Sequence, residues 1–183
     1  MTDKEKILIK HICNGDTQKF GLLVDSYGSR LLLFVGRIVG QQEDAEDVLQ
    51  NTFIAAYEHL KEYDSQRASI FTWLQRIAYH EALYYLRRNK KQLLLPLEAG
   101  CDIPDELPDT ITAEQLDEAI QQLSPEDQML LHLFYFDKRT LKDIAYITGS
   151  STDTLNREVS KLTTRLYRIR QRLKNILTRM NND

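Results

Sequence analysis

The chain has 183 residues, of which 42% are hydrophobic and 28% are charged, proportions that are typical of a folded globular protein and exclude an intrinsically disordered one. No run of residues approaches the roughly eighteen apolar positions that a membrane-spanning helix needs. Charges also interrupt the apolar stretch near the start, so we expect a cytoplasmic protein without a signal peptide or direct membrane insertion. Cys13 and Cys101 lie far apart with no metal-ligand spacing around them, which argues against a zinc site and a disulfide framework.

The net charge of -3 conceals two basic blocks. Lys and Arg minus Asp and Glu give -4 over residues 1–66, +5 over 67–92, -10 over 93–128 and +6 over 129–183. The segment 93–128 contains no Lys or Arg. Such asymmetry indicates a polyanionic partner, so each basic block is a candidate surface for nucleic acid.

The placement of glycine and proline predicts an all-α protein with one interruption. The chain contains 7 Gly and 4 Pro, and every proline lies between Pro96 and Pro125. Gly40 is the expected C-cap of one long helix, and a hydroxyl between Ser65 and Ser69 is expected to cap another. Apolar residues at three- and four-residue steps predict helices near 4–13 and over 20–38, 43–63 and 70–91.

The helical periodicity stops between Gln92 and Thr112, where three prolines and five acids mark a linker. Beyond this linker, the sequence from Thr112 to Gln115 fits a capping box that begins one helix. The pair Ser124-Pro125 fits the cap and first position of the next helix. The C-terminal segment is therefore predicted to be a separate helical unit.

A helix over 141–148, a left-handed cap at Gly149 and a last helix over about 152–180 form a candidate helix-turn-helix. The small residue Ala145 stands where the two helices of this motif cross. Apolar residues from Leu155 to Ile176 recur at three- and four-residue steps and are expected to face inward, with arginines elsewhere around the helix. The alternative is an antiparallel or coiled-coil helix with a solvated basic face.

Motifs for catalysis fail in this sequence. His80-Glu81 begins a pattern seen in zinc proteases, but Tyr84 stands where the second histidine is required. The sequence contains no glycine-rich phosphate loop and no nucleophile elbow. We therefore expect no enzymatic activity, no metal and no cofactor.

The segment 67–91 interleaves aromatic and basic residues, a pattern that suits single-stranded nucleic acid because bases stack on flat rings while cations follow the backbone. A partly buried position in the core is the alternative for Trp73, since it lies beside the apolar stripe. Arg87 and Arg88 have an alternative as well, because cations at the end of a helix compensate its dipole.

Two runs carry a resemblance to a known family. EDAEDVLQNTFIAAYEHL from Glu43, followed by FTWLQRIAYHEALYYLRRNKK from Phe71, resembles region 2 of sigma-70 family sigma factors of the extracytoplasmic-function (ECF) group. LDEAIQQLSPEDQMLLHLFYFDKRTLKDIAYITGSSTDTL from Leu116 is similar to their region 4. The resemblance implies an all-helical, noncatalytic protein that makes bacterial core RNA polymerase recognise and open particular promoters.

The resemblance also implies site residues, position by position. The acidic second helix of the family docks on the largest polymerase subunit, which assigns core binding to Asp44, Asp47, Gln50 and Phe53. The aromatic and basic helix captures a flipped minus-ten base, which assigns this DNA contact to Trp73, Arg76, Tyr79, His80, Arg87 and Arg88. The recognition helix reads the minus-35 element, which assigns that contact to Ser151, Thr152, Thr154, Asn156, Arg157 and Lys161.

Two departures from the family pattern limit this transfer. The chain has Tyr79-His80 and Tyr84 where the family usually has Arg-Asn and Asp, so the minus-ten preference is not inherited. The family's basic tail arrives late, as Arg165, Arg168 and Arg170, as though about seven residues were added to the last helix. Seven residues shift this tail by roughly 10 Å along the helix axis.

The expected organisation is a region 2 domain over 1–92, a linker over 93–112 and a region 4 helix-turn-helix domain over 113–183. The acidic linker either runs through basic channels of the polymerase or is a solvated spacer. The family implies an anti-sigma factor as a further partner. The alternatives are a helix-turn-helix regulator that acts without binding core polymerase and a helical scaffold protein with no role at nucleic acid.

Overall fold

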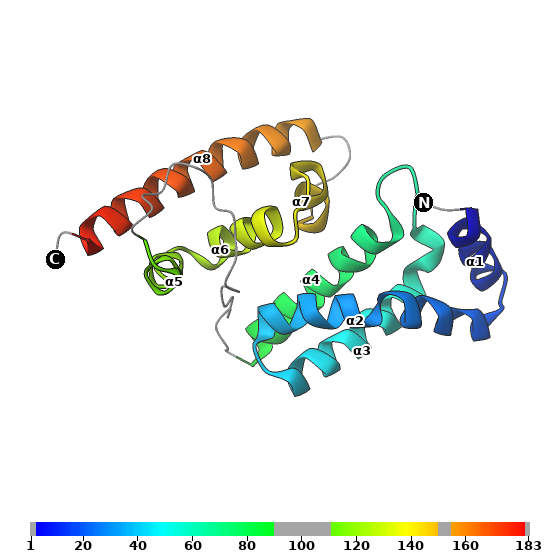
Figure 1. Ribbon diagram of the computed structural model, residues 1–183. Coiled ribbons are helices and arrows are strands. Elements are labelled where there is room, and N and C mark those ends of the chain that lie inside the picture. Colours follow the sequence, from blue (N-terminus) through cyan, green and yellow to red (C-terminus); the bar gives the residue numbers. More distant parts are fainter. Residues whose placement is uncertain (1–2, 90–110, 150–154, 182–183) are drawn as a thin grey trace. The chain divides into compact units, whose positions relative to one another are not determined.

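The computed structural model describes residues 3–89, 111–149 and 155–181, and every regular element within these ranges is helical (Figure 1). The predicted all-α fold class is therefore confirmed. The chain divides into two compact units, which are treated separately below. The described part of the first unit is 3–89 with 146–149, and that of the second is 111–145 with 155–181.

Three long helices form the core of the first unit, and each packs against the other two. These helices are α2 (Phe20–Val39), α3 (Gln42–His59) and α4 (Ile70–Arg88) (Figure 1). Each buries the larger part of the apolar stripe that predicted it, and the most deeply buried side chains include Leu23, Leu31, Ile38, Ile70 and Leu74. Burying one such aliphatic side chain contributes about 1.5–3 kcal/mol, so this shared interior is the main source of stability.

The ends of these helices follow local rules that the sequence predicted. Gly40 has φ +84°, a region that favours glycine, and its N–H donates to the Gly36 carbonyl at 2.8 Å. The Ser69 hydroxyl accepts a hydrogen bond from the Thr72 N–H at 3.1 Å and so caps the start of α4. The predictions of a C-cap at Gly40 and of a hydroxyl cap before Ile70 are both confirmed.

A side-chain hydrogen bond links the short helix α1 (Asp3–Cys13) to α2. The Tyr27 hydroxyl donates to Glu5 Oε1 at 2.5 Å. Burial, and after it this hydrogen bond, raises the pKa of Tyr27 above its ordinary value. The 3-10 turns η1 (Thr17–Lys19) and η2 (Leu60–Glu62) lie in the same unit, and η2 extends α3 nearly to the predicted end at Tyr63.

The second unit begins with two capped helices, α5 (Ala113–Gln121) and α6 (Pro125–Leu131). The Thr112 and Gln115 side chains each bond the backbone N–H of the other, which confirms the predicted capping box. The Ser124 hydroxyl accepts from the Asp127 N–H at 3.3 Å, with proline at the first position of α6 as predicted. A π-helical turn, η3 (His132–Phe136), continues α6 and was not predicted.

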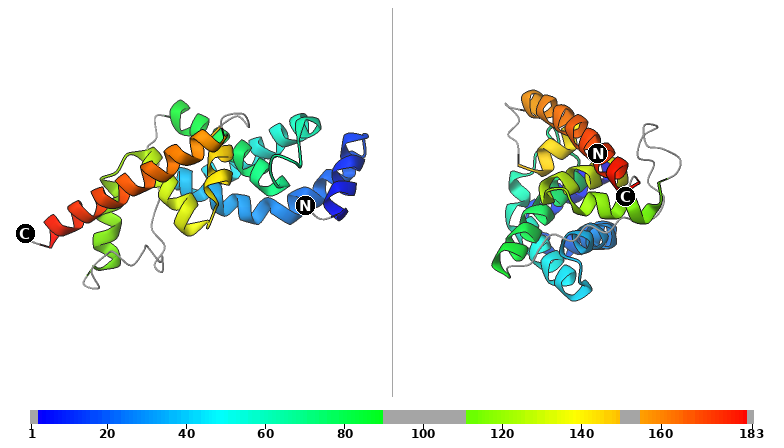
Figure 2. Two further views of the ribbon diagram at one scale, coloured as in Figure 1. Left: turned by 90° about the horizontal axis from the view of Figure 1, so that it is seen from above. Right: turned by 90° about the vertical axis from the view of Figure 1, so that its left-hand side faces the viewer.

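The second unit also contains α7 (Leu141–Ile147) as far as Ala145 and the long helix α8 (Leu155–Met180). Figure 2 shows α8 from two further directions as one uninterrupted helix. Its buried positions are Leu166, Ile169, Leu173 and Leu177. Val159, Leu162 and Ile176 were also expected to face inward and are half-buried, whereas Leu177, which was not predicted, is buried. None of the described helices is at once long and apolar enough to cross a membrane.

Candidate functional site

The residues predicted to bind core polymerase lie on α3, but their exposure differs. The Asp47 and Gln50 side chains are exposed, whereas that of Asp44 is half-buried. Phe53 is buried, and its ring packs edge-to-face with that of Phe20, the centroids lying 6.2 Å apart. Two of the four predicted residues are therefore exposed to solvent, while Phe53 helps to join α3 to α2.

An apolar groove of about 530 Å³ lies beside these residues, between α2 and α3. Its apolar lining consists of Phe20, Val24, Leu49, Phe53, Ile54 and Tyr57, with Gln50 at the same site. Ile54 and Tyr57 remain 53% and 44% exposed, although large apolar side chains usually lose water on folding. The sequence reasoning missed both residues, and the available signal was their three-residue spacing outside the buried stripe of α3.

A second, polar groove of about 360 Å³ lies between the first half of α3 and the last turns of α4. It is lined by Asp47, Gln50, Asn51, Glu81, Tyr84, Tyr85, Arg88 and Asn89. The fold thus brings two predicted core-binding residues next to Arg88, which was predicted to contact DNA. The sequence placed these two groups on different helices and could not show that they share a groove.

Trp73 and Tyr79 were predicted to contact minus-ten DNA, but both side chains are buried. Trp73 is 7% exposed, and its ring centroid lies 5.5 Å from that of Tyr63. Tyr79 is 8% exposed. The buried alternative for Trp73 therefore fits this structure, and neither ring presents a free face to a base. The exposed aromatic side chain on α4 is Tyr84, which is 60% exposed and stood in the sequence only as a departure from the family pattern.

The basic residues of α4 occupy different environments. Arg76 is half-buried, whereas His80, Arg87 and Arg88 are exposed. Arg87 Nε donates to the Leu83 carbonyl at 3.2 Å, a contact near the helix end that agrees with the alternative of dipole compensation. Arg88 lines the polar groove and is the basic residue of α4 best placed for a partner.

The predicted helix-turn-helix falls only partly within the described residues. Ala145 is fully buried in α7, as the motif requires where its two helices cross. Gly149 has φ +110°, as the motif requires in its turn. Asn156, Arg157 and Lys161 are exposed on α8, and Lys161 Nζ lies 2.6 Å from Glu158 Oε1. The remaining predicted minus-35 contacts, Ser151, Thr152 and Thr154, lie outside the described residues.

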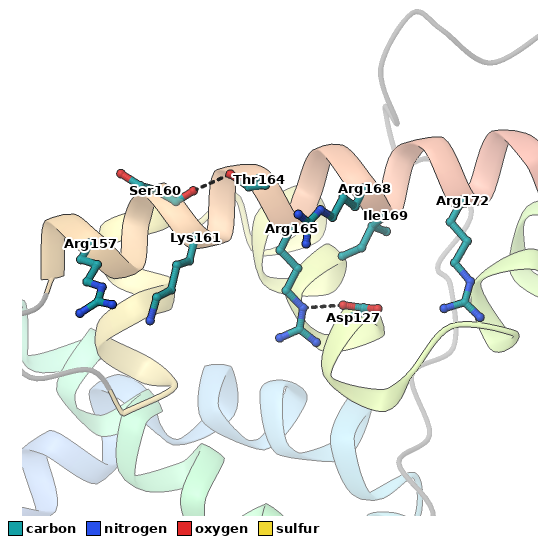
Figure 3. A pocket seen from close by; sticks show the side chains of 9 residues that line it. All are labelled: Asp127, Arg157, Ser160, Lys161, Thr164, Arg165, Arg168, Ile169 and Arg172. Atoms are coloured by element: carbon teal, nitrogen blue, oxygen red, sulfur yellow. Dashed lines mark hydrogen bonds and ion pairs between the residues drawn. The ribbon is translucent and has the colours of Figure 1, made fainter.

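A basic groove of about 740 Å³ follows α8 beside the first turn of α6 (Figure 3). Its charged lining consists of Arg157, Lys161, Arg165, Arg168, Arg172 and the single acid Asp127. Arg165 Nε donates to Asp127 Oδ1 at 2.6 Å. The sequence pattern placed these cations on α8 away from its apolar stripe. Only the packing of α6 against α8 shows that they line one groove.

Within the described residues, no group of three or more His, Cys, Asp or Glu side chains is arranged to hold a metal ion. The described residues instead include an apolar groove and a polar groove in the first unit and a basic groove in the second. Such surfaces are suited to binding macromolecules, because they are open and lack convergent reactive groups.

Comparisons with known proteins agree with this arrangement. A model of the Sigma-70 region 2 family matches residues 23–92, which contain α2, α3 and α4. The ECF RNA polymerase sigma factor SigW of Bacillus subtilis (strain 168) is 30% identical over 184 residues, covering 91% of this chain and 92% of SigW. The ECF RNA polymerase sigma factor SigF of Caulobacter vibrioides is 34% identical over 137 residues, covering 72% of this chain and 75% of SigF.

Solved structures resemble the fold as a whole. The structure of CnrH in complex with the cytosolic domain of CnrY matches with a TM-score of 0.60 at 21% identity, covering 96% of this chain and 98% of CnrH. The sigma factor RpoE in complex with the anti-sigma factor NepR, from Bartonella quintana, matches with a TM-score of 0.57 at 17% identity, covering 88% and 98%. These likenesses support the all-helical fold.

Proposed function

The chain belongs to the ECF RNA polymerase sigma factors, a noncatalytic family, and we propose how its parts share the task of directing core RNA polymerase to a promoter. The domain over 1–92 binds core polymerase through α3 and contacts the minus-ten element through α4. The domain over 113–183 binds the minus-35 element through the start of α8. No cofactor takes part, and the linker over 93–112 joins the two.

The observation that carries the polymerase contact is the exposed strip of α3 beside the apolar groove. Asp47 and Gln50 are in water, and Ile54 and Tyr57 continue the same surface with apolar side chains that the fold leaves exposed. An apolar centre with a polar rim is the usual composition of a protein interface. The acidic residues suit a basic partner surface, since complementary charge speeds and orients association.

Promoter opening is proposed to rest on binding energy alone. Tyr84 offers an exposed ring for stacking a base, and Arg88 offers a cation four residues later on the same helix face. Stacking and phosphate contacts to a separated strand offset the few kcal/mol that unpairing a base costs. Tyr84 replaces the buried Trp73 and Tyr79 as the stacking residue of this proposal.

A cellular location and an inhibitory partner follow from this function. Core polymerase and promoter DNA are found in the cytoplasm of a bacterium, so we place the chain there. A structure of similar fold contains an anti-sigma factor, so an anti-sigma factor is proposed as the inhibitory partner of this chain.

Reconstituted transcription tests the proposal. The purified chain and bacterial core polymerase are expected to initiate RNA synthesis at some promoters of a genomic library that core polymerase alone ignores. The Asp47→Arg substitution should abolish initiation and core binding, since it reverses one exposed charge on α3. Glu118→Arg, an equal charge reversal at an exposed position of α5, is the matched control and should retain core binding. Failure of the unaltered chain to initiate at any promoter would contradict the proposal.

A further inference from the structure

The end of α7 and the glycine turn after it belong to the first unit, which contains Tyr146 to Gly149 besides residues 3–89. Two side chains of α4 meet this segment. Arg76 Nη1 donates to the Tyr146 carbonyl at 2.6 Å, and Arg76 Cζ lies over the Tyr146 ring, 5.0 Å from its centroid. A Cβ built on Gly149 would lie 3.6 Å from His80 Cε1, so the turn passes close to the imidazole ring.

The Arg76 contact satisfies a carbonyl near the C-terminus of α7. The last four carbonyls of a helix lack a partner within it, and Tyr146 is the second-last residue of α7. The Tyr146 carbonyl accepts from the Gly149 N–H at 3.3 Å and from Arg76 at 2.6 Å. A hydrogen bond from a charged donor is about twice as strong as one between neutral groups, and cations are favoured near the C-terminus of a helix. Arg76 is therefore the stronger of the two donors at this carbonyl.

The neighbouring His80 does not oppose this contact by its charge. Partial burial, and after it the charges of Arg76 and Arg87, lowers the pKa of His80 below its ordinary value. The imidazole is therefore uncharged at neutral pH and adds no third cation beside the two arginines. The ring instead fills the space under the turn at Gly149.

Arg76 was predicted to contact the minus-ten element, yet in this structure it is half-buried and engaged by the end of α7. A phosphate or a base would have to displace the Tyr146 ring from the guanidinium and replace the bond at Nη1. We propose that the segment from Tyr146 to Gly149 is an autoinhibitory latch, which frees Arg76 for single-stranded nucleic acid only when it moves away from α4. The inference rests on the proposed function of α4 and adds Tyr146 as the residue that holds Arg76.

The strength of the latch sets the size of its effect. A latch lowers the apparent affinity for nucleic acid in proportion to the fraction of molecules in which it is open. The contact between the Arg76 cation and the Tyr146 ring is of the kind that changes an equilibrium about two- to fivefold at a partly exposed site. Affinity and local opening should change by the same factor when the ring is removed, because both depend on the open fraction.

The Tyr146→Ala substitution in the full chain tests the latch, because it removes the ring and keeps the backbone carbonyl. The probe is a fluorescently labelled single-stranded DNA of random sequence, and its anisotropy gives the affinity. Tyr146→Ala should bind this probe about two- to fivefold more tightly than the unaltered chain. Without DNA, hydrogen exchange of the Gly149 amide should become faster by a similar factor, since this N–H is bonded to the Tyr146 carbonyl.

Two further variants separate the latch from other effects at Tyr146. Tyr146→Phe is the matched control, because it keeps the ring over Arg76 and loses only the hydroxyl. It should leave both the affinity and the Gly149 exchange unchanged. Arg76→Ala removes the cation itself and should weaken binding of the probe. Tyr146→Ala added to Arg76→Ala should give no gain in affinity, since no arginine is left to release.

Three outcomes would overturn the proposal. They are an unchanged affinity in Tyr146→Ala, an equal gain in the Tyr146→Phe control, and a gain from Tyr146→Ala that persists when Arg76 is already alanine. Faster Gly149 exchange with an unchanged affinity would make the contact structural only. Circular dichroism of each variant reports whether it is folded. Failure of the sigma function itself is distinguishable, because it appears as absent transcription, whereas Gly149 exchange reports the latch without DNA or polymerase.

Discussion

Shortening Leu177 to alanine tests whether the end of α8 holds the second unit together. Leu177 is 2% exposed, α5 packs against α8, and the Gln115 side chain reaches Asn181 Oδ1 at 3.0 Å near the same end. Removing a buried leucine costs about 2–5 kcal/mol, which combines lost transfer energy and the cavity left behind. A domain of 60 to 100 residues shifts its melting temperature by about 4–8 °C per kcal/mol, so we expect a decrease of at least about 8 °C.

Two spectroscopic signals assign this loss to one unit. The chain has one tryptophan, Trp73, and it lies in the core of the first unit, so its fluorescence reports the melting of that unit. Far-ultraviolet circular dichroism reports both units. In the Leu177→Ala variant the dichroism should show a transition at lower temperature while the Trp73 fluorescence transition stays in place.

The neighbouring Thr178→Ala substitution is the control. The Thr178 hydroxyl is exposed and donates to the Lys174 carbonyl at 2.8 Å within the helix, so its loss should change stability by less than about 0.5 kcal/mol. A shift below about 2 °C in Leu177→Ala, or an equal shift in Thr178→Ala, would refute the reasoning that packing at this end stabilises the unit.

Three further predictions concern the first unit. Ser69→Ala removes the cap of α4 and should lower the free energy of unfolding by about 1 kcal/mol in urea denaturation, whereas Ser69→Asp should retain most of it. The pKa of Tyr27 is raised in the folded chain, so the stabilisation that Tyr27 contributes should be complete below pH 10.0. This stabilisation should decrease as the pH rises above that value. Tyr27→Phe, which loses the bond to Glu5, should lower stability at neutral pH and make the alkaline decrease smaller, and an unchanged alkaline profile would contradict the assignment. Ile54→Asp should weaken core-polymerase binding at least tenfold in a pull-down titration. The melting temperature should not change, because the Ile54 side chain is exposed. A lower melting temperature with unchanged binding would instead show that Ile54 has a structural role.

The start and end of each helix were predictable where a single short motif specifies them. Gly40 ends α2 because its positive φ is inexpensive only for glycine, and Thr112 begins α5 because its hydroxyl satisfies a backbone N–H three residues later. The family resemblance was equally readable, since its motifs occupy contiguous runs. Local sequence therefore determined the helical fold class, its caps and the sigma-factor family.

The environment of each site residue was decided by packing between helices. The period of α4 places Trp73 beside the apolar stripe, but only the packed structure shows that Trp73 is buried, with Tyr63 beside it, and that Tyr84 is the exposed ring. Asp127 and Arg165 are separated by 38 positions, and no local pattern could pair them. The helices and the family could be predicted from the chain's residue order, because these properties depend on neighbouring residues. The exposure of each side chain and the sharing of a groove by distant charges depend on how the helices pack, so they could be known only from the folded chain.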